Sequence, residues 1–119
     1  MSDRPTQPKV EPHTQALRLL GLARRAGRLV LGEAAVWAAC DKKTAHILFL
    51  ACDTARNTAQ KAQSHARAAG IECKTLPFDK QTLGHAFGRE ITAVAALTDE
   101  GFASAVRPYL TEEPATPTA

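Results

Sequence analysis

Residues 45–52, Ala-His-Ile-Leu-Phe-Leu-Ala-Cys, restrict the possible folds of this chain more than any other segment. The four positions 47–50 are all apolar, so the segment lacks the alternation of a strand with one wet face. Continuously apolar strands are typical of sheets that are covered on both faces. The sequence therefore predicts a strand over 45–52 in a sheet that has helices on both sides.

Helix-like and strand-like segments alternate along the chain. Apolar spacing predicts helices over residues 13–26, 33–42 and 58–69, a short helix between Asp79 and Gly88, and a last helix that begins after Thr98 or Asp99. Strands are predicted over residues 29–31, 45–52, 71–76 and 93–97. Asp79 is placed to cap its helix, and Pro108 should end or kink the last one. Strands that alternate with helices imply an α/β sandwich.

The length and charge of the chain suit one basic domain. A chain of 119 residues is most often a single domain. Prolines and polar residues dominate residues 1–12 and 111–119, which we expect to be flexible tails around a domain at 13–110. The net charge of the whole chain is +3. Residues 1–12 have a net charge of zero and residues 111–119 one of −2, so the net charge of the domain is +5. A compact basic domain favours a nucleic-acid partner.

Three cysteines, Cys40, Cys52 and Cys73, are widely spaced and form no Cys-x-x-Cys or Cys/His ligand pattern. The pattern indicates neither a disulfide framework nor a zinc site, and we expect buried free thiols in a reducing compartment. No export signal or long apolar run occurs. We therefore expect a cytoplasmic protein that has no membrane partner, metal or cofactor.

Catalytic constellations are weak in this sequence. Ser64 and His65 are neighbours on a predicted helix, so their side chains point about 100° apart and cannot pair directly. His85, Asp53 and Asp99 are better explained as a surface histidine, a loop residue and a helix cap. A small-molecule or enzyme domain that uses these three residues would need a concave pocket between the loops. The sequence predicts a protein that is not an enzyme.

Basic residues gather near the predicted ends of strands and helices. Arg28 precedes the first strand, Arg56 follows the central strand, and Arg89 leaves the fourth helix. Gly32 opens the second helix, and a helix N-terminus is a natural site for a phosphate. If the loops after Leu31, Cys52 and Phe87 converge, one rim of the sheet is shared by Glu33, Asp53, Arg56, Arg89 and Glu90. The alternative is that the arginines form only a solvated face.

Four segments stand out along the chain: Leu-Gly-Leu-Ala-Arg-Arg-Ala-Gly-Arg-Leu-Val-Leu-Gly-Glu (20–33), Leu-Phe-Leu-Ala-Cys-Asp (48–53) with Asn-Thr (57–58), Leu-Gly-His-Ala-Phe-Gly (83–88) and Ala-Val-Ala-Ala-Leu-Thr-Asp-Glu-Gly-Phe-Ala (93–103). Together and in this order, they resemble the YlxQ-like bacterial proteins. That family is similar to the archaeal and eukaryotic ribosomal proteins that bind kink-turn RNA. The resemblance implies a three-layer α/β/α sandwich with a small mixed four-stranded sheet. It also implies a non-enzymatic, ribosome-associated protein that binds structured RNA.

The second helix departs from the kink-turn binders. They open this helix with Gly-x-Asn-Glu-x-x-Lys, whose polar side chains reach bases and phosphates. Gly32 matches this motif, but Ala34, Ala35 and Ala38 replace the three polar residues. Each lost bidentate base contact is worth about 1–3 kcal/mol, so we expect reduced or altered RNA specificity.

The resemblance also directs the loop after the fourth helix toward RNA. In that loop, backbone and Ile91 would lie against exposed bases, and Arg89 would contact a phosphate. Trp37 either stacks on an unpaired base or packs against a neighbouring helix, and we favour packing. The predicted RNA-binding residues are Arg28, Gly32, Glu33, Ala34, Trp37, Arg56, Gly88, Arg89, Glu90 and Ile91.

The leading hypothesis is a monomer that binds structured RNA, either ribosomal RNA or the ribosome. The alternative is a protein-interaction module on the same fold that has lost the RNA site and uses Trp37 as an apolar anchor.

Overall fold

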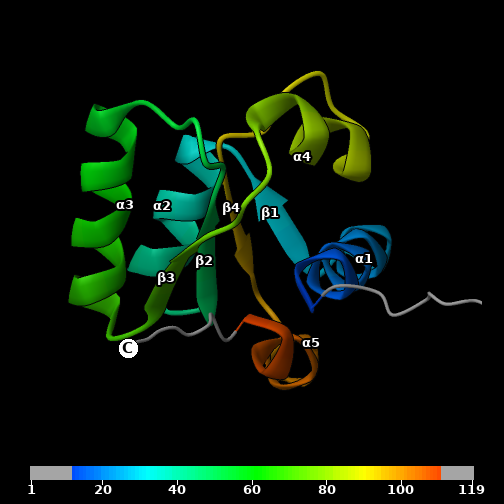
Figure 1. Ribbon diagram of the computed structural model, residues 1–119. Coiled ribbons are helices and arrows are strands. Elements are labelled where there is room, and N and C mark those ends of the chain that lie inside the picture. Colours follow the sequence, from blue (N-terminus) through cyan, green and yellow to red (C-terminus); the bar gives the residue numbers. More distant parts are fainter. Residues whose placement is uncertain (1–11, 111–119) are drawn as a thin grey trace, which may run out of the picture.

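The computed structural model describes residues 12–110, which form a four-stranded sheet between two layers of helices (Figure 1). The elements in chain order are α1 (Pro12–Arg25), β1 (Leu29–Leu31), α2 (Glu33–Asp41), β2 (Ile47–Leu50), α3 (Arg56–Ala69), β3 (Glu72–Thr75), α4 (Lys80–Phe87), β4 (Val94–Leu97), α5 (Glu100–Val106) and the 3-10 turn η2 (Arg107–Leu110). Helices and strands alternate throughout. The predicted three-layer α/β/α sandwich is confirmed.

The sheet is mixed, as predicted, and its strand order is β1-β4-β2-β3. The two inner strands, β4 and β2, are antiparallel, and Leu48 lies opposite Ala96. At the edges, β1 pairs antiparallel with β4, whereas β3 runs parallel to β2. The last strand of the chain therefore lies between the first two.

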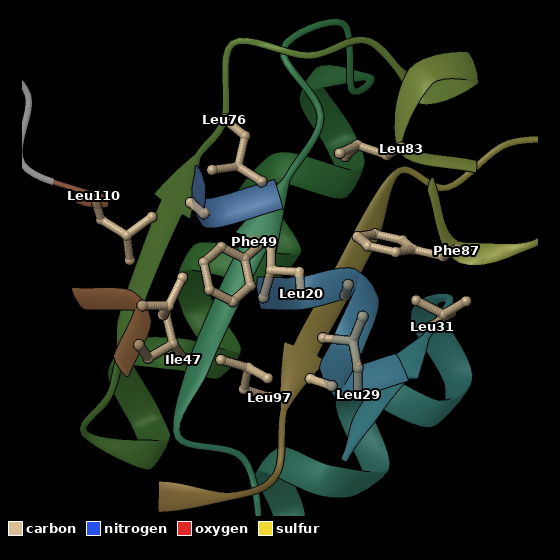
Figure 2. Close-up of a cluster of buried hydrophobic side chains, with 14 of the residues drawn as sticks. Leu20, Leu29, Leu31, Ile47, Phe49, Leu76, Leu83, Phe87, Leu97 and Leu110 are labelled. Atoms are coloured by element: carbon tan, nitrogen blue, oxygen red, sulfur yellow. The ribbon is translucent and has the colours of Figure 1, made fainter. Parts of the chain in front are cut away.

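Both faces of the sheet are covered. Side chains alternate along β2, so Ile47 and Phe49 enter one core while Leu48 and Leu50 enter the other, and all four are buried. The first core lies under α1, α4 and α5, where Leu20 packs beside Phe49 (Figure 2). This arrangement explains why β2 is apolar at every position.

Small side chains form the second core, between the sheet and the α2–α3 layer. Val36 on α2 and Ala62 and Ala66 on α3 are buried there. Because alanines line this face of α3, the helix lies close to the sheet and to α2. Ala59 and Ala69, on the same side of α3, pack against this core as well.

The helix ends follow the sequence signals. The Asp79 carboxylate accepts a hydrogen bond of 2.8 Å from the Thr82 N–H, and the Asp99 carboxylate accepts one of 2.9 Å from the Phe102 N–H. α5 ends at Val106 and continues as the 3-10 turn η2, which contains Pro108. Both predicted caps and the effect of the proline are confirmed.

The boundaries differ from the predictions by a few residues. β2 is shorter than 45–52, and α3 begins at Arg56 rather than at residue 58. Pro12 belongs to α1, where a proline is tolerated because the first-turn N–H has no helical partner. Both predicted tails otherwise lie outside the described residues. None of the helices in the described range is long and apolar enough to span a membrane.

The cysteine prediction is wrong at one position. Cys40 is buried and Cys73 is half-buried, but Cys52 is exposed. Cys52 lies just beyond the end of β2, where the chain leaves the cover of both helix layers. Burial raises the pKa of the Cys73 thiol to about 11, so this thiol is protonated near neutral pH.

Candidate nucleic-acid interface

Three of the predicted loops meet at one end of the sheet. The Gly32 N–H, at the end of β1, donates a hydrogen bond of 3.0 Å to the Val94 carbonyl, and the Ala51 N–H donates one of 3.0 Å to the Ala93 carbonyl. The segment that enters β4 is therefore held between the ends of β1 and β2. A hollow of about 220 Å³ lies between residues 31–33 and 89–94.

The N-terminus of α2 opens at this end of the sheet. Gly32 has φ 90° and ψ 158°, a conformation that glycine adopts far more easily than other residues. Among residues 12–110, no side chain caps this helix end. The first-turn N–H groups of Glu33, Ala34 and Ala35 consequently lack helical acceptors and are suited to an anionic ligand.

Glu33 ties α2 to α3. Its Oε2 accepts a hydrogen bond of 3.0 Å from the Thr58 hydroxyl, and Thr58 lies in the first turn of α3. Arg56 is two residues earlier, so it is near this end of α2, and its side chain is exposed. Thr58 has no role in the sequence prediction because its partner lies 25 positions away. The Asn-Thr pair at 57–58 was the only part of the start of α3 that the family resemblance included.

The loop after α4 is folded back on its own helix. Gly88 ends α4 in the left-handed conformation, and the Arg89 N–H donates a hydrogen bond of 2.7 Å to the Gly84 carbonyl. The Thr92 N–H donates another, of 2.9 Å, to the Lys80 carbonyl. These bonds hold Arg89 and Glu90 exposed and leave Ile91 with 57% of its surface in solvent.

Two further side chains fix the loop that follows β2. The Thr54 hydroxyl lies 2.7 Å from the Ala51 carbonyl and 3.1 Å from the Ala93 carbonyl. Asp53 accepts a hydrogen bond of 2.9 Å from the Lys80 N–H, which anchors the start of α4. The expected structural role of Asp53 is confirmed. Threonine and aspartate after a strand are typical of such turns, but the sequence does not reveal their distant partners.

Arg28 does not join this group. Its carbonyl accepts a hydrogen bond of 2.9 Å from the Thr98 N–H, and its guanidinium Nε lies 4.0 Å from an oxygen of Asp99. Both partners follow β4, whereas the loop 88–93 precedes it. β1 and β4 are antiparallel, so Arg28 lies at the opposite end of the sheet from Gly32 and Arg89.

Trp37 packs against α3. Its ring stacks on that of His65, with centroids 4.4 Å apart and planes inclined by 7°. The indole also contacts the small-residue core between α2 and α3. The packing alternative is confirmed, and the ring face that His65 covers is unavailable to a base or a protein partner.

The residues of the enzyme alternative are not brought together. Asp99 follows β4 and Asp53 follows β2. Because these two strands are antiparallel, the two aspartates lie at opposite ends of the sheet. His85 is exposed on α4. Within residues 12–110, no group of three His, Cys, Asp or Glu side chains is placed to hold a metal ion.

Hydrogen bonding also sets the charge of one group beside the interface. The backbone N–H of Thr82 holds the pKa of the exposed Asp79 carboxyl below its usual value. Asp79 therefore remains ionised as a helix cap at neutral pH. The hydrogen bond between Asp79 and Thr82 therefore holds the start of α4 under physiological conditions. The loop 88–92 returns to this part of α4 through the bond from Thr92 to Lys80.

Comparison with known proteins relates the chain to an RNA-associated family. Residues 14–107 match the sequence profile of the "Ribosomal protein L7Ae/L30e/S12e/Gadd45 family". RNA-binding protein YlxQ of Bacillus subtilis (strain 168) is 35% identical over 86 residues, which cover 72% of this chain and 85% of that protein. RNA-binding protein YlxQ of Enterococcus faecium is 33% identical over 89 residues, which cover 75% of this chain and 84% of that protein.

Solved structures agree with this relationship. A Bacillus halodurans protein of unknown function superposes with a TM-score of 0.77 at 30% identity, covering 82% of this chain and 98% of that one. The Giardia lamblia 15.5kD RNA binding protein superposes with a TM-score of 0.70 at 16% identity, covering 92% and 94%, which shows the shared fold. The chain therefore belongs to the ribosomal protein L7Ae/L30e/S12e/Gadd45 family, as a YlxQ-like member of it.

Proposed function

We propose that this chain is a non-catalytic protein that binds structured RNA of the kink-turn type at the end of the sheet where α2 begins. We define the RNA surface as Gly32, Glu33, Ala34, Arg56, Gly88, Arg89, Glu90 and Ile91. The observation that carries the proposal is the position of the uncapped N-terminus of α2 beside a loop that exposes Arg89 and Ile91.

Positive groups on both sides of the hollow would attract a phosphate, and Glu33 and Glu90 offset part of their charge. The free N–H groups of α2 carry the positive end of the helix dipole. Arg56 adds a cation to the first turn of α3, where the helix dipole itself disfavours positive charge. Arg89 borders the same hollow from the other side. A bound phosphate would accept hydrogen bonds from the N–H groups, and both arginines would attract the RNA backbone.

The apolar part of the surface suits an unstacked base. Ile91 is one of only two large apolar side chains in the described region that are strongly exposed. RNA proteins recognise bases that are splayed out of a helix, and such bases offer flat apolar faces. We infer that Ile91 packs against a base of the kink, while the loop backbone follows the strand.

Alanine at positions 34, 35 and 38 limits base recognition. These side chains carry no donors or acceptors, so at these three positions α2 offers no side-chain readout. RNA shape and charge would then supply most of the selectivity, with lower specificity than in kink-turn binders that retain the polar residues. The two YlxQ relatives are RNA-binding proteins by name, and the family includes ribosomal proteins. We therefore propose that this chain binds ribosomal RNA or the ribosome in the cytoplasm, as a monomer.

The test is a comparison of two RNAs. Affinity is measured for a kink-turn RNA and for a straight duplex of equal length and base composition, across a salt series. We expect the kink-turn RNA to bind more tightly, and both affinities to fall as salt rises because bound phosphates release counterions. Equal affinities would contradict the kink-turn proposal and leave general RNA binding. Absence of binding to both RNAs would contradict the RNA function and favour a protein partner.

A further inference from the structure

The outward face of α1 carries an apolar side chain between two arginines. Arg18, Leu22 and Arg25 are spaced four and three residues apart, so they lie along one side of the helix. All three are exposed, whereas Leu20 and Ala23 face the core. Leu22 keeps 51% of its surface in solvent and is the other strongly exposed large apolar residue of the described region.

A hollow lies beside this stripe, between α1 and α4, which cover the same face of the sheet (Figure 1). Gly21 and Ala86 leave it open because neither has a side chain large enough to fill it. A hydrogen bond of 3.4 Å from the Arg24 guanidinium on α1 to the Phe87 carbonyl on α4 links the two helices. The volume is about 250 Å³, smaller than the roughly 300–1,000 Å³ of typical ligand sites, and suits an inserted side chain rather than a cofactor.

The two arginines that flank the hollow, Arg18 and Arg25, form no ion pair with any carboxylate of residues 12–110. α1 contains no aspartate or glutamate from Pro12 to Arg25. Other arginines, such as Arg107, do form ion pairs. Arg18 and Arg25 are seven positions apart, which is about 10 Å along the helix axis.

We propose that this groove docks an acidic amphipathic helix of a protein partner. One apolar side chain of the partner enters the hollow against Leu22 and Gly21. Two carboxylates seven positions apart on the partner match the spacing of Arg18 and Arg25, and arginine binds carboxylates with two parallel hydrogen bonds. Between the two arginines the hollow is lined by Gly21, Leu22 and Ala86, whose side chains offer no hydrogen bond to a base, and the exposed Leu22 favours a protein over RNA. Arginine is also enriched at protein interfaces.

The experiment uses the full chain and a synthetic helical peptide as the probe. The probe carries two glutamates seven positions apart with a leucine between them, and a control peptide has glutamine at both positions. Fluorescence anisotropy should show that the glutamate peptide binds at least about tenfold more tightly than the control. Arg18→Glu with Arg25→Glu should abolish this preference, and a peptide with two lysines should bind that double variant instead.

Gly21→Ala tests the hollow without changing any charge. An added Cβ would lie 3.7 Å from the Ala86 carbonyl oxygen, an ordinary contact, so the variant should fold and partly fill the hollow. We expect weaker probe binding together with a higher melting temperature, a combination that loss of structure would not produce. RNA affinity should be unchanged in this variant.

Two results would overturn the proposal. One is equal binding of both peptides, or of neither, to the unchanged chain. The other is a loss of kink-turn RNA affinity in the Arg18→Glu, Arg25→Glu variant that matches its loss of peptide affinity, because the groove would then belong to RNA. The failure of RNA binding in the unchanged chain would leave the peptide result intact, so the two functions are tested separately.

Discussion

Gly84 lies directly against the backbone of Glu90. A Cβ at position 84 would be 2.6 Å from the Glu90 carbonyl oxygen and 2.7 Å from Cα of Ile91. No backbone tolerates such distances, so the loop that carries Arg89 and Ile91 keeps its position only because residue 84 has no side chain. The interface proposed for RNA thus depends on a buried glycine one turn inside α4.

Gly84→Ala should therefore destabilise the protein and displace the loop. Overpacking of this kind costs about 1–3 kcal/mol, which urea unfolding would show as a lower midpoint. Gly21→Ala is the matched control, because the same change in α1 meets no close atom and should stabilise the helix by about 0.5–1 kcal/mol. Equal unfolding midpoints for the two variants would contradict the tight contact.

Arg89→Ala should weaken RNA binding through loss of one phosphate contact. The magnitude of the slope of log affinity against log salt should fall by about 0.7–0.9. Arg28→Ala removes the same charge at the opposite end of the sheet, and we expect its salt slope to equal that of the unchanged chain. A larger effect at Arg28 than at Arg89 would move the RNA surface to the other end.

Restoring polar residues on α2 should increase specificity. Ala34→Asn, Ala35→Glu and Ala38→Lys together reproduce the side chains that kink-turn binders present after the glycine. The preference for kink-turn RNA over the straight duplex should grow by about 1–3 kcal/mol for each bidentate contact that forms. The added glutamate and lysine cancel in net charge, so a gain in preference would not come from net charge alone. An unchanged preference in the triple variant would show that α2 does not face the RNA bases.

Stability should depend on pH through Asp79. Its pKa is lowered in the folded state by the Thr82 N–H, so its stabilising contribution is complete above the unfolded value of about 3.9 and is lost as pH falls through the lower folded value. Asp79→Ala should consequently lower the urea midpoint at neutral pH and have a smaller effect in strong acid. Asp79→Asn keeps an acceptor oxygen. It should remove the contribution of residue 79 to the pH dependence of stability and lower the urea midpoint at neutral pH less than Asp79→Ala does. The hypothesis fails if the effect of Asp79→Ala grows as the pH is lowered.

The sequence predicted the elements well because their signals are local. The apolar run 47–50 identified a strand covered on both faces, and Asp79 and Asp99 marked helix starts by contacts three residues away. Alternation of helices and strands then limited the architecture to a covered sheet. These features need no knowledge of distant neighbours.

The candidate site was harder to predict because its contacts join distant segments. Glu33 meets Thr58, and Trp37 meets His65, across gaps that periodicity does not reveal. Arg28 was grouped with the loop at Arg89 because both lie near element ends, but the direction of β1 separates them. Strand direction depends on the completed sheet, so residue spacing alone could not assign these ends.

The position of β4 has a consequence for how the chain is made. Within residues 12–110, β4 is the last strand to be synthesised, yet it lies between β1 and β2, and it is the only strand that pairs with β1. During translation, β1 therefore has no strand to pair with until residues 94–97 have left the ribosome. A fragment that ends at Thr92 should accordingly lack the cooperative thermal transition of the full chain in circular dichroism. Folding of this domain is therefore completed only near the end of its own synthesis.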